Sequence, residues 1–230
     1  MNIADNLNIV ENKIQEALQK SGDPDRDVHI IAVTKTISTE TIRCAMKSGL
    51  TNLGENKVQE LVSKYEQIGS GPNWHMIGHL QRNKVKYIVD KVSLIHSMDS
   101  LSLAEEINKK AGKVKRDIDV LVQVNVSGEE SKFGVDPESA LDLIESMETM
   151  QWVRIKGLMT MAPFTANQQV TRDCFKRLFE LREKIWSMNF NNAEMKYLSM
   201  GMSNDYQTAV EEGSNMVRIG SAIFGNRNYD

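Results

Sequence analysis

The sequence predicts an α/β fold, a TIM-type (βα)8 barrel that forms a single domain over residues 1–230. Three observations support this prediction. Short apolar runs alternate with helical patterns along the chain, eight such units fit within about 200 residues, and the runs lack the polar alternation of half-exposed strands. Repeated strand and helix units imply parallel strands joined by right-handed crossovers, and eight of them suffice to close a barrel.

An amphipathic helix is expected before the first strand, within residues 1–22. Apolar residues recur there at spacings of four or three, and Ser21, Gly22, Asp23 and Pro24 then end the pattern. The apolar positions are Ile3, Leu7, Val10, Ile14 and Leu18.

The first strand is expected at 28–34, where VHIIAVT is apolar and rich in β-branched residues, as in a strand covered on both faces. Seven more strands are expected at 51–54, 73–77, 92–96, 118–124, 152–160, 195–199 and 215–219. Helical patterns lie between them at 38–48, 56–68, 82–90, 100–111, 136–149, 167–188 and 203–212. An open, doubly wound sheet is the alternative, but no G-x-G-x-x-G follows the first strand to begin a dinucleotide-binding half.

Composition narrows the classes of partner. The chain has 28 Lys and Arg against 31 Asp and Glu, a net charge of −3, so no general attraction to nucleic acid or to anionic membranes is expected. The first residues lack a signal peptide pattern and no apolar stretch reaches ~20 residues, so we expect a cytoplasmic protein. Cys44 and Cys174 lie in helical patterns and are expected to be small buried hydrophobes rather than a disulfide or a zinc site.

Lys35 is the first candidate for chemistry, because active sites of such barrels lie at the carboxyl ends of the strands. It follows the first apolar strand, and an ammonium buried there must lose its proton easily or find a partner. An amine with a lowered pKa forms a Schiff base with an aldehyde cofactor or a carbonyl substrate. A strand-end lysine that merely reaches solvent is the plainer alternative.

Two late segments suit a phosphate group. SMGMSND and RIGSAIFG place glycine and serine directly after the seventh and eighth strands, where barrels commonly bind phosphate on backbone N–H groups. Two ordinary glycine turns are the alternative. Arg218, near the end of the eighth strand, cannot lose its proton and needs an acceptor, which a pyridine nitrogen or a carboxylate could provide.

The four histidines, His29, His75, His79 and His96, lack the spacing of metal ligands, and no metal site is predicted. His79 stays a candidate because it follows Gly78 at a strand end. Lys132, in the loop after the fifth strand, could meet an anion at the barrel mouth, although a solvated lysine is the more usual outcome.

Seven motifs in order resemble one family over nearly the whole chain. They are AVTKT (32–36), GENKVQE (54–60), WHMIGHLQRNK (74–84), VNVSGEESKFG (124–134), GLMTMAP (157–163), LSMGMSNDY (198–206) and VRIGSAIFG (217–225). The set resembles the pyridoxal phosphate homeostasis proteins, also called PLP-binding proteins. The resemblance implies a barrel similar to the N-terminal domain of alanine racemase, with pyridoxal 5'-phosphate (PLP) at the carboxyl ends of the strands.

The same resemblance implies roles for individual residues. Lys35 matches the Schiff-base lysine, Arg218 the group that faces the pyridine nitrogen, and Asn56 a neighbour of the cofactor ring. Ser199, Met200, Gly220 and Ser221 match the phosphate cradle, and His79 is a further candidate at the cofactor.

The expected function is that of a non-catalytic PLP carrier in vitamin B6 homeostasis, a monomer that holds PLP reversibly and delivers it to apoenzymes. A permanent cation at the pyridine nitrogen disfavours the pyridinium and weakens the ring as an electron sink. Racemisation also needs a second acid or base, which alanine racemases take from a partner's tyrosine alongside a C-terminal β domain, and this chain ends at Asp230. A small PLP-dependent amino-acid racemase and a lysine-dependent aldolase acting on a sugar phosphate are the alternatives.

Overall fold

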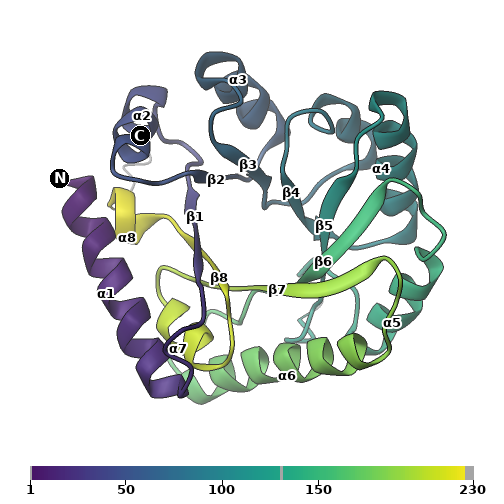
Figure 1. Ribbon diagram of the computed structural model, residues 1–230. Helices are drawn as coiled ribbons and strands as arrows, with labels where there is room; N and C mark the ends of the chain where they lie inside the picture. The colour runs from purple at the N-terminus through teal and green to yellow at the C-terminus, as the bar shows by residue number, and fades with distance from the viewer. Residues whose placement is uncertain (1, 130–131, 226–230) are drawn as a thin grey trace.

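The computed structural model describes residues 2–129 and 132–225, and its eight strands close into a barrel (Figure 1). Every neighbouring pair is parallel and follows the order of the sequence, and β1 pairs with β8 to complete the ring. The strands are β1 (His29–Val33), β2 (Asn52–Glu55), β3 (Asn73–Met76), β4 (Leu94–Met98), β5 (Ile118–Gln123), β6 (Val153–Met159), β7 (Ala193–Met202) and β8 (Met216–Ile219). The predicted barrel and its eight strands are confirmed, and the open sheet is excluded.

Helices cover the outside of the barrel (Figure 1). They are α1 (Ile3–Ser21), α2 (Thr39–Lys47), α3 (Val58–Ile68), η1 (Arg82–Tyr87), α4 (Leu101–Val114), α5 (Pro137–Ser146), α6 (Gln168–Ser187), α7 (Tyr206–Glu211) and α8 (Ser221–Phe224). The expected helix at 82–90 is instead the short 3-10 helix η1. The Ile88 N–H, directly after η1, donates to the Val85 carbonyl over 3.1 Å, which is the bond between residues three apart that is typical of a 3-10 helix. The four-residue α8 has no counterpart in the sequence prediction.

The expected N-terminal helix is α1, and both of its ends are capped. The Asn2 side chain accepts a hydrogen bond from the Ala4 N–H, and Gly22 adopts the left-handed conformation at φ 77°. The apolar face packs beside α7 and α8 (Figure 1), where Asn6 Nδ2 donates to the Ile223 carbonyl over 2.8 Å. The first helix therefore supports the last two elements of the barrel.

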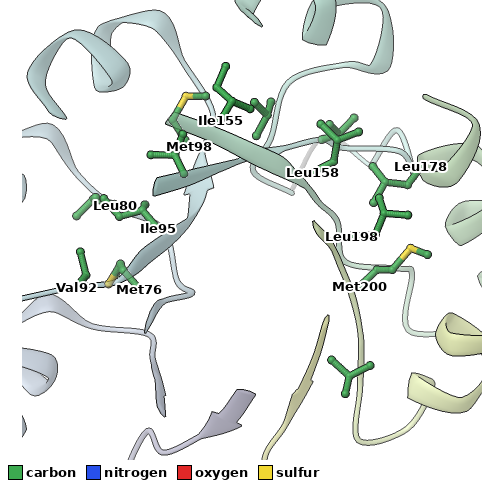
Figure 2. Close-up of a cluster of buried hydrophobic side chains, with 14 of the residues drawn as sticks. Met76, Leu80, Val92, Ile95, Met98, Ile155, Leu158, Leu178, Leu198 and Met200 are labelled. Carbon is green, nitrogen blue, oxygen red and sulfur yellow. The ribbon is translucent and has the colours of Figure 1, made fainter. Parts of the chain in front are cut away.

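The main core lies between the strands and the helices. Figure 2 shows part of it, with Leu198 and Met200 of β7 beside Leu178 of α6. A second, smaller cluster comes from five different strands, as expected of side chains that fill the barrel interior: Ile31, Leu94, Leu121, Met159 and Met216. The two clusters thus pack against both faces of the strands and hold the strand ends in place.

The two cysteines differ in burial. Cys174 is buried on α6, as expected, and burial raises the pKa of its thiol to about 11. Cys44 is exposed, which corrects the prediction, because α2 turns Ile42 and Ala45 toward the core and leaves Cys44 between them on the outer side. Within the described ranges, no helix is long and apolar enough to span a bilayer, and no group of three or more His, Cys, Asp or Glu side chains is arranged to hold a metal ion.

Candidate functional site

Lys35 lies at a sharp corner just after β1. The residue is half-buried, and its Nζ atom has no hydrogen-bond or ion-pair partner in residues 2–129 and 132–225. Thr36, the next residue, has φ 64°, a conformation that β-branched residues rarely adopt and that costs free energy. The Thr36 N–H donates to Glu60 Oε1 over 2.6 Å, which compensates part of that cost. Strain beside an unpartnered amine marks this corner as a candidate site.

A polar cluster of buried Thr34, Glu55 and Lys64 with half-buried Glu60 supports this corner. Lys64 Nζ, which is only 6% exposed as a residue, donates to the Thr34 carbonyl over 2.6 Å and to the Glu55 and Glu60 carboxylates over 2.7 Å each. Thr34 Oγ1 donates to Glu55 Oε1 over 2.6 Å. The residues on both sides of Lys35 are therefore tied to one cluster, which the sequence prediction missed.

Burial and hydrogen bonds shift the pKa values of both carboxyl groups in this cluster. Burial raises the pKa of Glu55, although the hydrogen bonds from Lys64 and Thr34 act in the opposite direction. For Glu60, burial also acts to raise the pKa, but the bonds from Lys64 and from the Thr36 N–H prevail and lower it. Glu55 Oε2 is buried without a hydrogen-bond partner among the described residues, so Glu55 depends on Lys64 for its charged state.

Arg218 is the second candidate, and it lies on β8, the strand that pairs with β1. Its guanidinium is buried and donates from Nη1 to the Ser199 carbonyl over 2.8 Å and to Ser199 Oγ over 2.7 Å, and from Nη2 to the Thr160 carbonyl over 2.9 Å. Burial lowers the pKa of Arg218 to about 10, with Asp205 acting to raise it. Arg218 therefore remains a cation at neutral pH.

The two segments predicted to bind phosphate do meet. Ser203 Oγ accepts hydrogen bonds from the backbone N–H groups of Gly220, over 3.2 Å, and Ala222, over 3.3 Å. The N–H groups of Asn204 and Ser221 donate to no described group. This corner therefore offers free backbone donors, while the Gly220 N–H is already used by Ser203.

Ser199 and Met200 contribute differently from what the motif suggested. The Ser199 hydroxyl is fully buried and bonded to Arg218 and to His96, and the Met200 side chain lies in the main core (Figure 2). Neither side chain faces the phosphate corner, so only backbone groups of these two residues could serve there. Their assignment to a phosphate cradle stays a prediction in that restricted form.

Asn56 directly follows β2 and has a side-chain amide without a hydrogen-bond partner in the described part of the chain. Its backbone is approached closely by the next strand end, because a Cβ atom on Gly78 would lie 2.3 Å from the Asn56 carbonyl oxygen. Only glycine at position 78 allows the two strand ends to meet in this way. Asn56 thus presents a free donor and acceptor at the carboxyl ends of the strands.

His79 and Lys132 each have their own partners in the loops at the carboxyl ends of the strands. His79 Nδ1 lies 3.5 Å from Asp99 Oδ2, and its ring stacks on Phe133 with 3.9 Å between the centroids. A cavity of about 670 Å³ opens beside His79 and Asp99, and neither Lys35 nor Arg218 lines it. Lys132 pairs with Glu129 over 3.0 Å. No described contact joins His79 to Lys35, so its predicted role at the cofactor stays untested.

The family of the alanine racemase N-terminal domain matches residues 6–228. The chain is 43% identical over 230 residues to the pyridoxal phosphate homeostasis protein of Aquifex aeolicus, with all of both chains covered. The protein of the same name from Haemophilus influenzae is 37% identical over 232 residues, with 100% of this chain and 98% of the relative covered.

Solved structures of a PLP-bound protein and of a racemase are also similar to this chain. PipY of Synechococcus elongatus PCC7942, in a structure with PLP bound, has a TM-score of 0.84 and 30% identity, over 97% of this chain and 100% of PipY. An alanine racemase of Clostridium difficile has a TM-score of 0.77 at 17% identity, with 58% of its length covered. The likeness to the racemase shows a shared fold and no more.

Replacing Lys64 tests the cluster below the Lys35 corner. Lys64→Met is expected to lower the free energy of unfolding by about 3–5 kcal/mol at pH 8, because it leaves the Glu55 carboxylate buried and unpaired. Burial raises the pKa of Glu55 in the folded state above its value in the unfolded chain. Ionised Glu55 therefore destabilises the folded state at pH values above the folded-state pKa, and this destabilisation is absent below the unfolded-state pKa. The loss should therefore shrink toward pH 5, as measured by urea unfolding at both pH values.

A double variant provides the control for this experiment. Glu55→Gln with Lys64→Met removes the buried carboxylate, so its stability relative to the native chain should change much less between pH 5 and pH 8. An equal or larger loss for Lys64→Met alone at pH 5 would contradict the account of the cluster.

Proposed function

The chain belongs to the pyridoxal phosphate homeostasis protein family, and on that premise we propose that it holds PLP reversibly through Lys35 and releases it to apoenzymes as a monomeric, non-catalytic carrier. PLP, when bound, supplies an aldehyde that condenses with a lysine amine. The observation that carries the proposal is the unpartnered Lys35 amine at a strained strand end, on the strand next to the one that carries the buried Arg218 cation.

Free polar groups around the strand ends fit the remaining parts of this cofactor. Among the residues that the structure describes, the Asn56 amide has no partner and is available to the ring, and the N–H groups of Asn204 and Ser221 are likewise available to a phosphate. Arg218 donates three hydrogen bonds to Ser199 and Thr160 and has further N–H donors for the pyridine nitrogen. Each part of PLP therefore has a chemically suitable partner in the chain.

The charge of Arg218 favours a carrier over an amino-acid racemase. Even with its pKa lowered to about 10, the guanidinium stays protonated at neutral pH and donates to the pyridine nitrogen instead of supplying a proton. A ring that is not protonated withdraws electrons weakly, so α-proton removal gains little from it. The covalent link to Lys35 then serves as reversible storage.

The described tyrosines do not supply a second acid or base either. Tyr206 is buried in the core, Tyr65 packs against Trp74, and the Tyr197 ring lies edge-on to His29. Tyr87 is exposed on η1, with Lys86 above its ring. None of these tyrosines has a described contact with Lys35, which favours the carrier over the racemase.

Lys35→Ala tests the attachment point. The unmodified protein should develop a visible absorption band with PLP, and borohydride should fix the cofactor on Lys35 in the digested protein. The variant should show no such band and should bind PLP at least about tenfold more weakly, because it loses the reversible covalent bond. Equilibrium dialysis measures the change in affinity.

Lys47→Ala is the matched control, because Lys47 is an exposed lysine in the last turn of α2. It should bind PLP as the native chain does. Reduction that labels another lysine while Lys35 stays unmodified would refute the assignment of Lys35, and a native chain that PLP cannot colour would refute PLP binding itself.

Exchange of the α-proton separates the carrier from the racemase. With the PLP-loaded protein in heavy water and a panel of amino acids, proton NMR should show no exchange above that caused by free PLP. The expectation rests on the Arg218 cation and on the contacts of the described tyrosines, none of which involves Lys35. Fast exchange that Lys35→Ala abolishes would favour the racemase.

A further inference from the structure

A line of buried polar side chains crosses the barrel interior behind Arg218. Ser199 Oγ, which accepts from Arg218 Nη1, lies 2.9 Å from His96 Nδ1, and His96 Nε2 lies 3.0 Å from His75 Nδ1. His75 Nε2 lies 3.4 Å from Asn52 Oδ1. Ser199 and His96 are fully buried, although β4 and β7 are not neighbours in the barrel. Buried polar groups of this kind are retained only when they are hydrogen-bonded.

The far end of this line opens at the opposite face of the barrel. A cavity of about 400 Å³ is lined by residues at the amino ends of several strands, among them Asn52, His75 and Leu94. The line therefore runs from Arg218, near the carboxyl end of β8, to the amino-terminal face.

Arg218 fixes the direction of every hydrogen bond in the line. A guanidinium only donates, so Ser199 Oγ accepts from it and gives its own hydrogen to His96 Nδ1. His96 must then carry its hydrogen on Nε2 and donate to His75 Nδ1, and His75 in turn donates from Nε2 toward Asn52. The reverse direction would leave the buried Ser199 hydroxyl hydrogen without an acceptor.

The acceptor at the end of the line fits this direction. Asn52 Oδ1 also accepts from Asn73 Nδ2 over 3.0 Å, so it acts as the terminal acceptor for two donors. Burial lowers the pKa of both histidines, His75 to about 3, so both are neutral as the direction requires. A neutral ring carries a single ring N–H, and the direction of the line places it on Nε2 of both His96 and His75.

We propose that His96 and His75 are positioning residues, a one-way hydrogen-bond relay that locks the Arg218 guanidinium through Ser199 and leaves its remaining N–H groups for the ligand at the strand ends. The proposal rests on the proposed function only where it names that ligand as PLP. The orientation of Arg218 itself is a property of the protein without cofactor.

The tautomers are tested in the protein without PLP. Nitrogen-15 NMR of the histidine side chains at pH 7, assigned through His75→Gln and His96→Gln, should show both rings neutral with the hydrogen on Nε2. The signals of His29 and His79, which are more exposed, serve as references. A hydrogen on Nδ1 of either ring would overturn the direction and with it the proposal.

The effect on Arg218 is tested with two variants of His96. His96→Leu removes both hydrogen bonds, whereas His96→Gln keeps an acceptor toward Ser199 and a donor toward His75. In folded protein without PLP, rotation of the Arg218 guanidinium, measured by NMR, should be roughly tenfold faster in His96→Leu and close to native in His96→Gln. Native rotation in a folded His96→Leu protein would overturn the proposal.

A final arm separates this proposal from the proposed function. If PLP binds, His96→Leu should weaken its affinity and shift the visible band, and His96→Gln should restore both. If the native chain fails to bind PLP, the proposed function is refuted, whereas the relay is still judged by the tautomers and by the rotation of Arg218.

Discussion

The permanent positive charge of Arg218 inside the barrel is the constraint around which the interior is arranged. A buried guanidinium cannot shed its proton at neutral pH, so its N–H groups need acceptors, and the Ser199 carbonyl, the Ser199 hydroxyl and the Thr160 carbonyl satisfy three of them. Ser199 then needs an acceptor of its own, which His96 supplies. One donor-only side chain on β8 thereby sets the direction of the side-chain hydrogen bond between Ser199 of β7 and His96 of β4.

The Lys35 corner is governed by a second buried charge. Lys64 satisfies the Thr34 carbonyl and two carboxylates, and Glu60 in turn holds the strained Thr36 N–H. Lys35 itself takes no part in these bonds, so its amine is left free while its backbone is held in place. A lysine whose backbone is held in place while its amine makes none of these bonds suits a site that binds and releases a small aldehyde.

The sequence was sufficient for the barrel, because apolar strand runs and helix periodicity are local signals that repeat eight times. It also placed Lys35, Asn56 and Arg218 at strand ends, which follows from counting strands. It could not find the Glu55 and Lys64 pair, since nothing in a helical Glu60 and Lys64 spacing reveals that the lysine is buried. The inward turn of Ser199 was likewise hidden, because it depends on His96, 103 residues away in the chain.

We propose that the bond to Lys35 stores PLP reversibly for use by other proteins. Transfer kinetics test it most directly: the PLP-loaded protein is mixed with a PLP-dependent apoenzyme, and its activation is compared with that by the same concentration of free PLP. We expect the loaded protein to activate the apoenzyme at least as fast as free PLP does. The Lys35→Ala variant should retain too little PLP to be compared in this way. Activation that only follows slow spontaneous dissociation, or none at all, would contradict a carrier role.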